Sequence, residues 1–123
     1  GIHILETKQI MRNMHMGKPH HHKPQKDPKA HWRVETIKDI EVGDTITWST
    51  PGGADDTDIT IWFPPVPEWD PLGVGTVTLR KGQSISKNVP AGIKKEHYHY
   101  SVFCHSNGKM AEGSQSPPEM IID

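Results

Sequence analysis

Short runs of alternating apolar and polar residues, separated by glycine and proline, fill the chain from His31 to Asp123. Alternation with a period of two places one face of each run in a core and the other in water, which is typical of half-buried β-strands. No run keeps the 3.6-residue period of an amphipathic helix. Strands are predicted over 32–36, 40–48 (with a turn inside it), 58–63, 75–79, 84–89, 98–104 and 120–123.

Proline and glycine set the boundaries of these runs. Segment 64–71 holds four prolines and cannot be a central strand or a helix, so it is predicted to be an irregular crossover. Short strands with turns at this spacing are typical of a sandwich or a barrel. With 123 residues, the chain is long enough for one domain with one core. The pattern therefore predicts an all-β sandwich or barrel.

Residues 1–30 do not follow this pattern. Segment 17–28 contains three prolines, which exclude a helix, and its polarity prevents it from forming a core. We therefore expect an irregular N-terminal arm over 1–30 and a folded domain over 31–123. The arm has a net charge of +4 and the remainder −5. Its basic residues are interleaved with histidine and methionine instead of forming a dense patch, so nucleic-acid binding is not expected.

The arm is rich in soft metal donors. Thioethers bind Cu(I), whereas imidazoles suit copper, zinc and nickel. His-rich tracts often mark metal binding, although a solvated tail or a purification remnant has the same composition. We predict copper binding here, with zinc or nickel possible at the histidines. The candidate donors are Met11, Met14, His15, Met16, His20, His21 and His22.

A second set of donors follows the strand predicted over 98–104. Cys104 is the only cysteine and cannot form an internal disulfide; His105 follows it directly, and Met110 lies six residues after it. Thiolate, imidazole and thioether are the ligands that select copper. The alternative is that Cys104 is a small buried apolar residue, because free cysteine is among the most buried residue types.

Two stretches carry a resemblance to the cupredoxins, the small blue-copper β-barrel family. They are Val42-Gly-Asp44-Thr-Ile46-Thr-Trp48 and Tyr100-x-Val102-x-Cys104. The resemblance covers roughly residues 31–123. It implies a Greek-key β-sandwich with a Cys-bearing strand that carries the thiolate ligand inward. The closing segment 111–122 is similar to a subgroup in which the copper loop is altered.

The sequence departs from the cupredoxin pattern at two ligand positions. No histidine lies between His31 and His97, and the upstream ligand position falls near Asp58. His105 touches Cys104 in sequence, and adjacent side chains of an extended chain point to opposite faces. Met110 keeps a plausible axial position. An altered or degenerate copper site is therefore expected, and Asp58 is open to an alternative role in an acidic turn.

His97 and His99 form a further pair. Residues two apart on a strand lie on one face, about 7 Å apart at their Cα atoms, which allows one ion to be chelated. The same alternation places them opposite Cys104, so they cannot join it at one metal in a regular strand. The alternative is two exposed polar residues on the solvent face.

These features predict an exported copper-binding protein that captures, buffers or transfers copper. The alternatives are one-electron transfer at a type 1 or altered copper centre on Cys104, and a metal-free structural or interaction domain. No Ser/His/Asp ordering, phosphate loop or pair of carboxylates suggests an enzyme. The expected partners are a metal ion and a copper-donor or redox-partner protein.

A periplasmic or extracellular location is expected for the mature chain. The sequence begins with neither a signal peptide nor a methionine, which is expected of a mature exported form and equally of a trimmed form. No apolar run approaches the roughly 20 residues of a membrane span, so none is expected.

Overall fold

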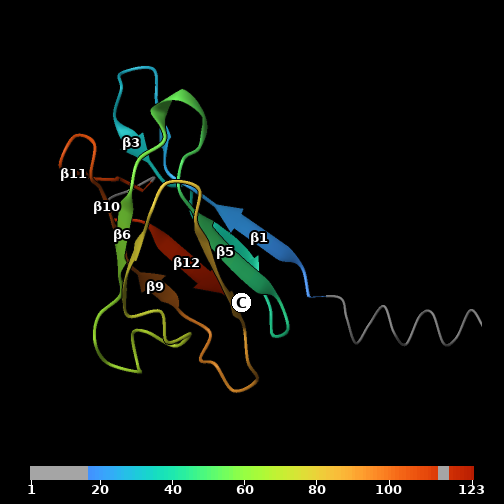
Figure 1. Ribbon diagram of the computed structural model, residues 1–123. Coiled ribbons are helices and arrows are strands. Elements are labelled where there is room, and N and C mark those ends of the chain that lie inside the picture. The colour runs from blue at the N-terminus through green and yellow to red at the C-terminus, as the bar shows by residue number, and fades with distance from the viewer. Residues whose placement is uncertain (1–16, 114–116) are drawn as a thin grey trace, which may run out of the picture.

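The computed structural model describes residues 17–113 and 117–123. In these ranges the backbone forms β-strands and one short 3-10 helix, Gly53–Asp55, without any α-helix (Figure 1). The all-β expectation is confirmed. No helix in this part of the chain could cross a membrane. The strands are β1 (Pro19–His22), β2 (Gln25–Lys26), β3 (Trp32–Arg33), β4 (Ile37–Ile40), β5 (Thr45–Ser49), β6 (Ile59–Trp62), β7 (Thr76–Leu79), β8 (Ser84–Asn88), β9 (His97–His99), β10 (Ser101–Cys104), β11 (Lys109–Met110) and β12 (Glu119–Ile122).

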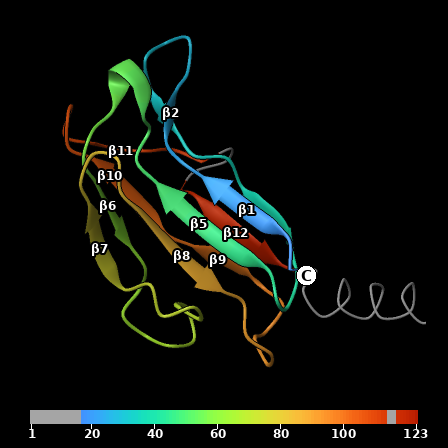
Figure 2. The same ribbon diagram turned by 45° about the vertical axis from the view of Figure 1, so that its right-hand side comes forward.

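The strands form two facing layers. In the first, β5 lies between β1 and β8 (Figure 2). The second combines β4-β12-β9 with β11-β10-β6-β7, because only Tyr100 separates β9 from β10. Trp48 of β5 packs edge-on against Phe63 and Tyr100, at centroid distances of 5.9 and 6.0 Å. These contacts across the layers make a sandwich-like arrangement with one shared core.

The core follows the period-two alternation of the sequence. In β5, Ile46 and Trp48 are buried while the three residues around them are only partly covered. In β10, Val102 and Cys104 are buried and the other two residues are not. The predicted irregular crossover is also found, because no strand lies between the end of β6 and Thr76. Local sequence pattern therefore accounts for the inner faces of the sandwich.

The N-terminal segment differs from its prediction. Residues 1–16 lie outside the described part of the chain, but Pro19–His22 form strand β1 in place of an irregular arm. This strand runs parallel to β5, with Pro19 opposite Thr45 and His22 opposite Trp48. Backbone hydrogen bonds to a single neighbour hold an edge strand, and a proline, which has no N–H to donate, is tolerated at the first residue of such a strand. The small pair β2–β3 then continues the segment into the predicted domain.

A buried carboxylate holds this strand in place. Asp44 is 1% exposed and accepts hydrogen bonds from Lys18 N at 2.8 Å, His20 Nε2 at 2.9 Å and Glu41 N at 2.9 Å. Burial raises the pKa of this carboxyl, but the hydrogen bonds from His20, Glu41 and Lys18 outweigh burial and leave the pKa lowered. We call these four residues the Asp44 clamp; it joins β1 to the turn before β5.

Replacing Asp44 tests the clamp. Asp44→Ala leaves three donors without their acceptor, so we expect the free energy of unfolding to fall by about 2–4 kcal/mol in urea titrations. Asp55→Ala is the matched control, because Asp55 is exposed and makes only a surface ion pair with Lys26. It should change stability by less than about 0.5 kcal/mol. Equal effects of the two substitutions would contradict a structural role for the clamp.

The clamp also predicts a pH dependence. Because the pKa of Asp44 is lowered on folding, its contribution is complete above the ordinary value of about 3.9 and is lost as the pH falls through the folded value. Stability measured below pH 4 should therefore fall less steeply in Asp44→Asn than in the unchanged chain. An identical acid limb in both proteins would contradict the assignment.

Gly17 permits the close approach of the segment that enters β1. A Cβ atom at this position would clash with the carbonyl oxygen of Gly43, so the backbone would have to move. We expect Gly17→Ala to cost about 1–3 kcal/mol of stability. Amide hydrogen exchange should show the loss concentrated in β1. Unchanged protection of these amides would mean that the two backbones do not meet as described.

Candidate metal sites

Cys104 lies at the end of β10 with its side chain in the core. The strand pairs with β6, where Cys104 is opposite the buried Ile59, and the cysteine itself is 0% exposed. Burial raises the pKa of the thiol to about 11. Without a metal, the group is therefore a neutral thiol at neutral pH. These surroundings are those of a small buried apolar residue, the alternative that the sequence left open for Cys104.

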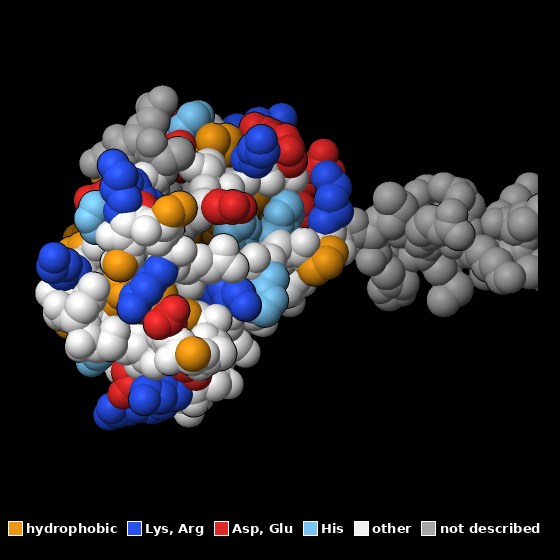
Figure 3. Space-filling model, turned by 90° about the horizontal axis from the view of Figure 1, so that it is seen from above, with side chains coloured by type: hydrophobic (Ala, Val, Ile, Leu, Met, Phe, Trp, Pro, Cys, Tyr) orange, Lys and Arg blue, Asp and Glu red, His pale blue; other side chains and the backbone are white. Residues whose placement is uncertain are grey.

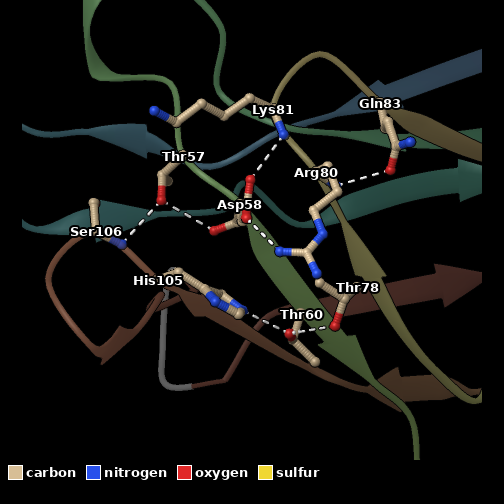
Figure 4. A network of polar contacts seen from close by, with 9 residues as sticks. All are labelled: Thr57, Asp58, Thr60, Thr78, Arg80, Lys81, Gln83, His105 and Ser106. Atoms are coloured by element: carbon tan, nitrogen blue, oxygen red, sulfur yellow. Dashed lines mark hydrogen bonds and ion pairs between the residues drawn. The ribbon is translucent and has the colours of Figure 1, made fainter.

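His105 lies on the other side of the sheet. Its Nε2 is 2.8 Å from Thr60 Oγ1 (Figure 4). Its ring packs edge-on against Phe103, at a centroid distance of 5.4 Å. Thr60 belongs to the outer face of β6, because its neighbours Ile59 and Ile61 are buried. The alternation of adjacent residues thus continues through the end of the strand, and His105 does not turn back toward Cys104.

Met110 is also on the outer side. It belongs to β11, lies opposite Phe103 of β10, and is 51% exposed. The three ligands expected on this loop are therefore not gathered: the sulfur of Cys104 is inside the sandwich, while the side chains of His105 and Met110 are outside it.

Asp58 has a structural role at the upstream ligand position. Its carboxylate accepts a hydrogen bond from Lys81 N at 2.9 Å and another from Arg80 Nη1 at 3.0 Å (Figure 4). These bonds, that from Lys81 first, lower the pKa of Asp58. The backbone oxygen of Asp58 also accepts from His105 N at 3.0 Å. The residue thus ties the start of β6 to the turn after β7 and to the loop after β10.

The side chains of the three histidines of β1 alternate between the two faces of the sheet. The register with β5 places His20 and His22 on the same face as the buried Ile46 and Trp48, at the edge of the sheet. His21 points to the opposite face, where its Nε2 lies 2.8 Å from Ser49 Oγ. The neighbouring candidates Met11, Met14, His15 and Met16 lie outside the described residues.

His22 is the histidine with a shifted pKa. Burial lowers this pKa, the nearby His20 lowers it further, Glu35 opposes the shift, and His21 adds a smaller lowering. The imidazole is therefore neutral at neutral pH, which is the form that binds metals. It lines a groove of about 500 Å³ together with His21 and Glu35. On the face shown in Figure 3, histidines lie among lysines, arginines and acidic residues.

The described residues contain no ready-made metal centre. In 17–113 and 117–123, no three His, Cys, Asp or Glu side chains form a group that could hold an ion as they stand. No known protein family matches the chain, and no curated protein matches it. The cupredoxin resemblance remains a prediction that depends on the two stretches of sequence described above.

The position of Cys104 predicts an unreactive thiol. At pH 8 a group with a pKa of about 11 is a thiolate in only about one molecule in a thousand, and its burial blocks access as well. Alkylation of the native protein should be about a hundredfold or more slower than that of a small exposed thiol. Labelling in urea should restore the full rate. Rapid labelling of the folded chain, followed by mass spectrometry, would contradict the buried position.

Proposed function

We propose that the chain captures and buffers copper on donors of residues 11–22, carried at the edge of an all-β sandwich and not inside it. The observation that supports this most is the placement of His20 and His22 on one face of β1, held by register with β5. A donor-rich stretch directly before a fixed strand keeps several weak donors at a high effective concentration.

The hydrogen bond of His20 prepares it to bind a metal. Asp44 is ionised, so its carboxylate can only accept, and Nε2 of His20 must carry the hydrogen. When the ring binds a metal, its lone pair is then on Nδ1. A carboxylate that orients a histidine through its other nitrogen is the usual second contact of metal-binding imidazoles. The Asp44 clamp thus fixes both the strand and the orientation of this ring.

His22 supplies a neutral second imidazole on the same face. Two residues on one strand face lie about 7 Å apart at their Cα atoms, within the reach of two rings toward one ion. Met11, Met14 and Met16 would add thioethers, which select Cu(I), and His15 a further imidazole. The same histidines could accept zinc or nickel when copper is absent.

The observations favour this proposal over electron transfer at Cys104. A type 1 centre needs a thiolate and two imidazoles around one ion. Here the thiol lies inside the sandwich, and His105 lies on the other face of the sheet. Sites made of imidazole and thioether alone should lack the intense colour that a thiolate gives to a cupric type 1 centre.

The cupredoxin-type topology and an exported location belong to the same proposal. Strand β10 returns by a long connection to lie antiparallel to β6, whose other neighbour is β7, and this supports a Greek-key arrangement. A copper-buffering protein of this kind would work in the periplasm or outside the cell and exchange copper with a donor protein.

Copper titration of variants tests the proposal. We expect the affinity for Cu(I) to fall by about tenfold or more in a Met11→Leu/Met14→Leu/Met16→Leu variant, because leucine keeps the apolar shape but removes the donors. His22→Gln should lower the affinity of the chain for Cu(II). Isothermal titration with separate cuprous and cupric ions measures both.

Cys104→Ala is the control for an interior site. It should leave the copper stoichiometry of the chain unchanged. Loss of one ion in this variant, or an intensely coloured cupric form of the unchanged chain, would favour electron transfer. Absence of copper binding to every form would leave a structural or interaction domain.

A further inference from the structure

Two histidines and one glutamate converge on the outer face of the second layer. His97 and His99 belong to β9, which pairs antiparallel with β12 so that Glu119 lies opposite His99. Both histidine side chains are 58% exposed, and that of Glu119 is 24% exposed. None of the three belongs to β1 or to the loop after Cys104. We call them the β9–β12 trio.

The rings of His97 and His99 both lie near the same oxygen atom of Glu119. His97 Nδ1 lies 3.4 Å and His99 Nε2 lies 3.8 Å from Glu119 Oε2. His97 forms a long hydrogen bond with this oxygen, and His99 Nε2 lies just beyond hydrogen-bond distance, so the carboxylate faces both rings. Two ligands on one tetrahedral ion, each bonded at about 2.0–2.2 Å, are separated by roughly 3.3–3.6 Å. The His97–Glu119 pair already has the spacing of two ligands on one ion, and the exposed His99 ring would have to move closer to join them.

The backbone under the trio is fixed from the inner side. Tyr98, between the two histidines, is 2% exposed, and its hydroxyl donates a hydrogen bond to the Lys94 carbonyl. Met120, the register partner of Tyr98 on β12, is fully buried. Trp69 packs edge-on against the Tyr98 ring, at a centroid distance of 6.2 Å. The two imidazoles above this backbone are exposed. A rigid strand pair fixes the positions from which the three donors extend, which favours a preorganised site.

We propose that His97, His99 and Glu119 bind one divalent ion of the zinc or cupric class. As metal ligands, two imidazoles and a carboxylate carry a charge of −1, which suits a dication, and they lack the sulfur that Cu(I) prefers. Three protein ligands leave a fourth position for water or for a donor from another molecule. The trio is not closed as it stands, and the ion completes it by drawing the exposed rings inward.

Zinc binding to the full chain tests this site. Isothermal titration with zinc chloride should show one ion fewer per chain in His97→Gln/His99→Gln than in the unchanged chain. Each single substitution should lower the affinity of that site about tenfold or more, since changes outside the ligand set already cost 10–100-fold. His31→Gln is the matched control, because its exposed imidazole lies 3.8 Å from the single carboxylate of Asp27. It should change neither quantity.

A measurement on the unchanged chain gives a second test. One equivalent of zinc should shift the imidazole nitrogen resonances of His97 and His99. Unchanged stoichiometry in the double variant, or shifts confined to other histidines, would overturn the proposal. Thioethers contribute little to zinc binding, so the result is independent of the Met→Leu variants that test copper capture. Cupric ion used in place of zinc shows which of the two dications the site prefers.

Discussion

The buried carboxylate of Asp44 is the constraint on which the N-terminal part of this protein depends. Strand β1 is polar and lies at a sheet edge, so it contributes little apolar surface of its own. Three hydrogen bonds to one ionised group replace what hydrophobic burial supplies elsewhere. The same group orients His20, so stability of the edge and preparation of a metal ligand are a single property of the molecule.

Much of the sandwich could be predicted from the sequence because burial imposes a period of two. Ile46 with Trp48 and Val102 with Cys104 are buried where the alternation placed them. Strand β1 (Pro19–His22) could not be found in this way, because its three consecutive histidines do not alternate with apolar residues. Its hydrogen-bond partner lies 24 positions away, which no local pattern reveals.

The candidate sites divide along the same line. The geometry of an extended chain predicts that Cys104 and His105 lie on opposite faces of the sheet, and they do so in the structure. The pairing of Asp58 with Arg80 depends on how two strands and a turn meet, and only the fold discloses it. Likewise, the spacing of His97 and His99 was visible in the sequence, whereas the glutamate between their rings depends on strand register.

Strand β12 lies between β4 and β9 and is parallel to one and antiparallel to the other. Its two neighbours are therefore connected in the sheet only through residues 119–122. Proteolytic clipping before Glu119 would do more than shorten the chain: it would leave Ile37 and Ile40 without their cover and present two bare strand borders to other molecules. Aggregation, not a smaller functional protein, is the fate that this arrangement implies for a clipped chain.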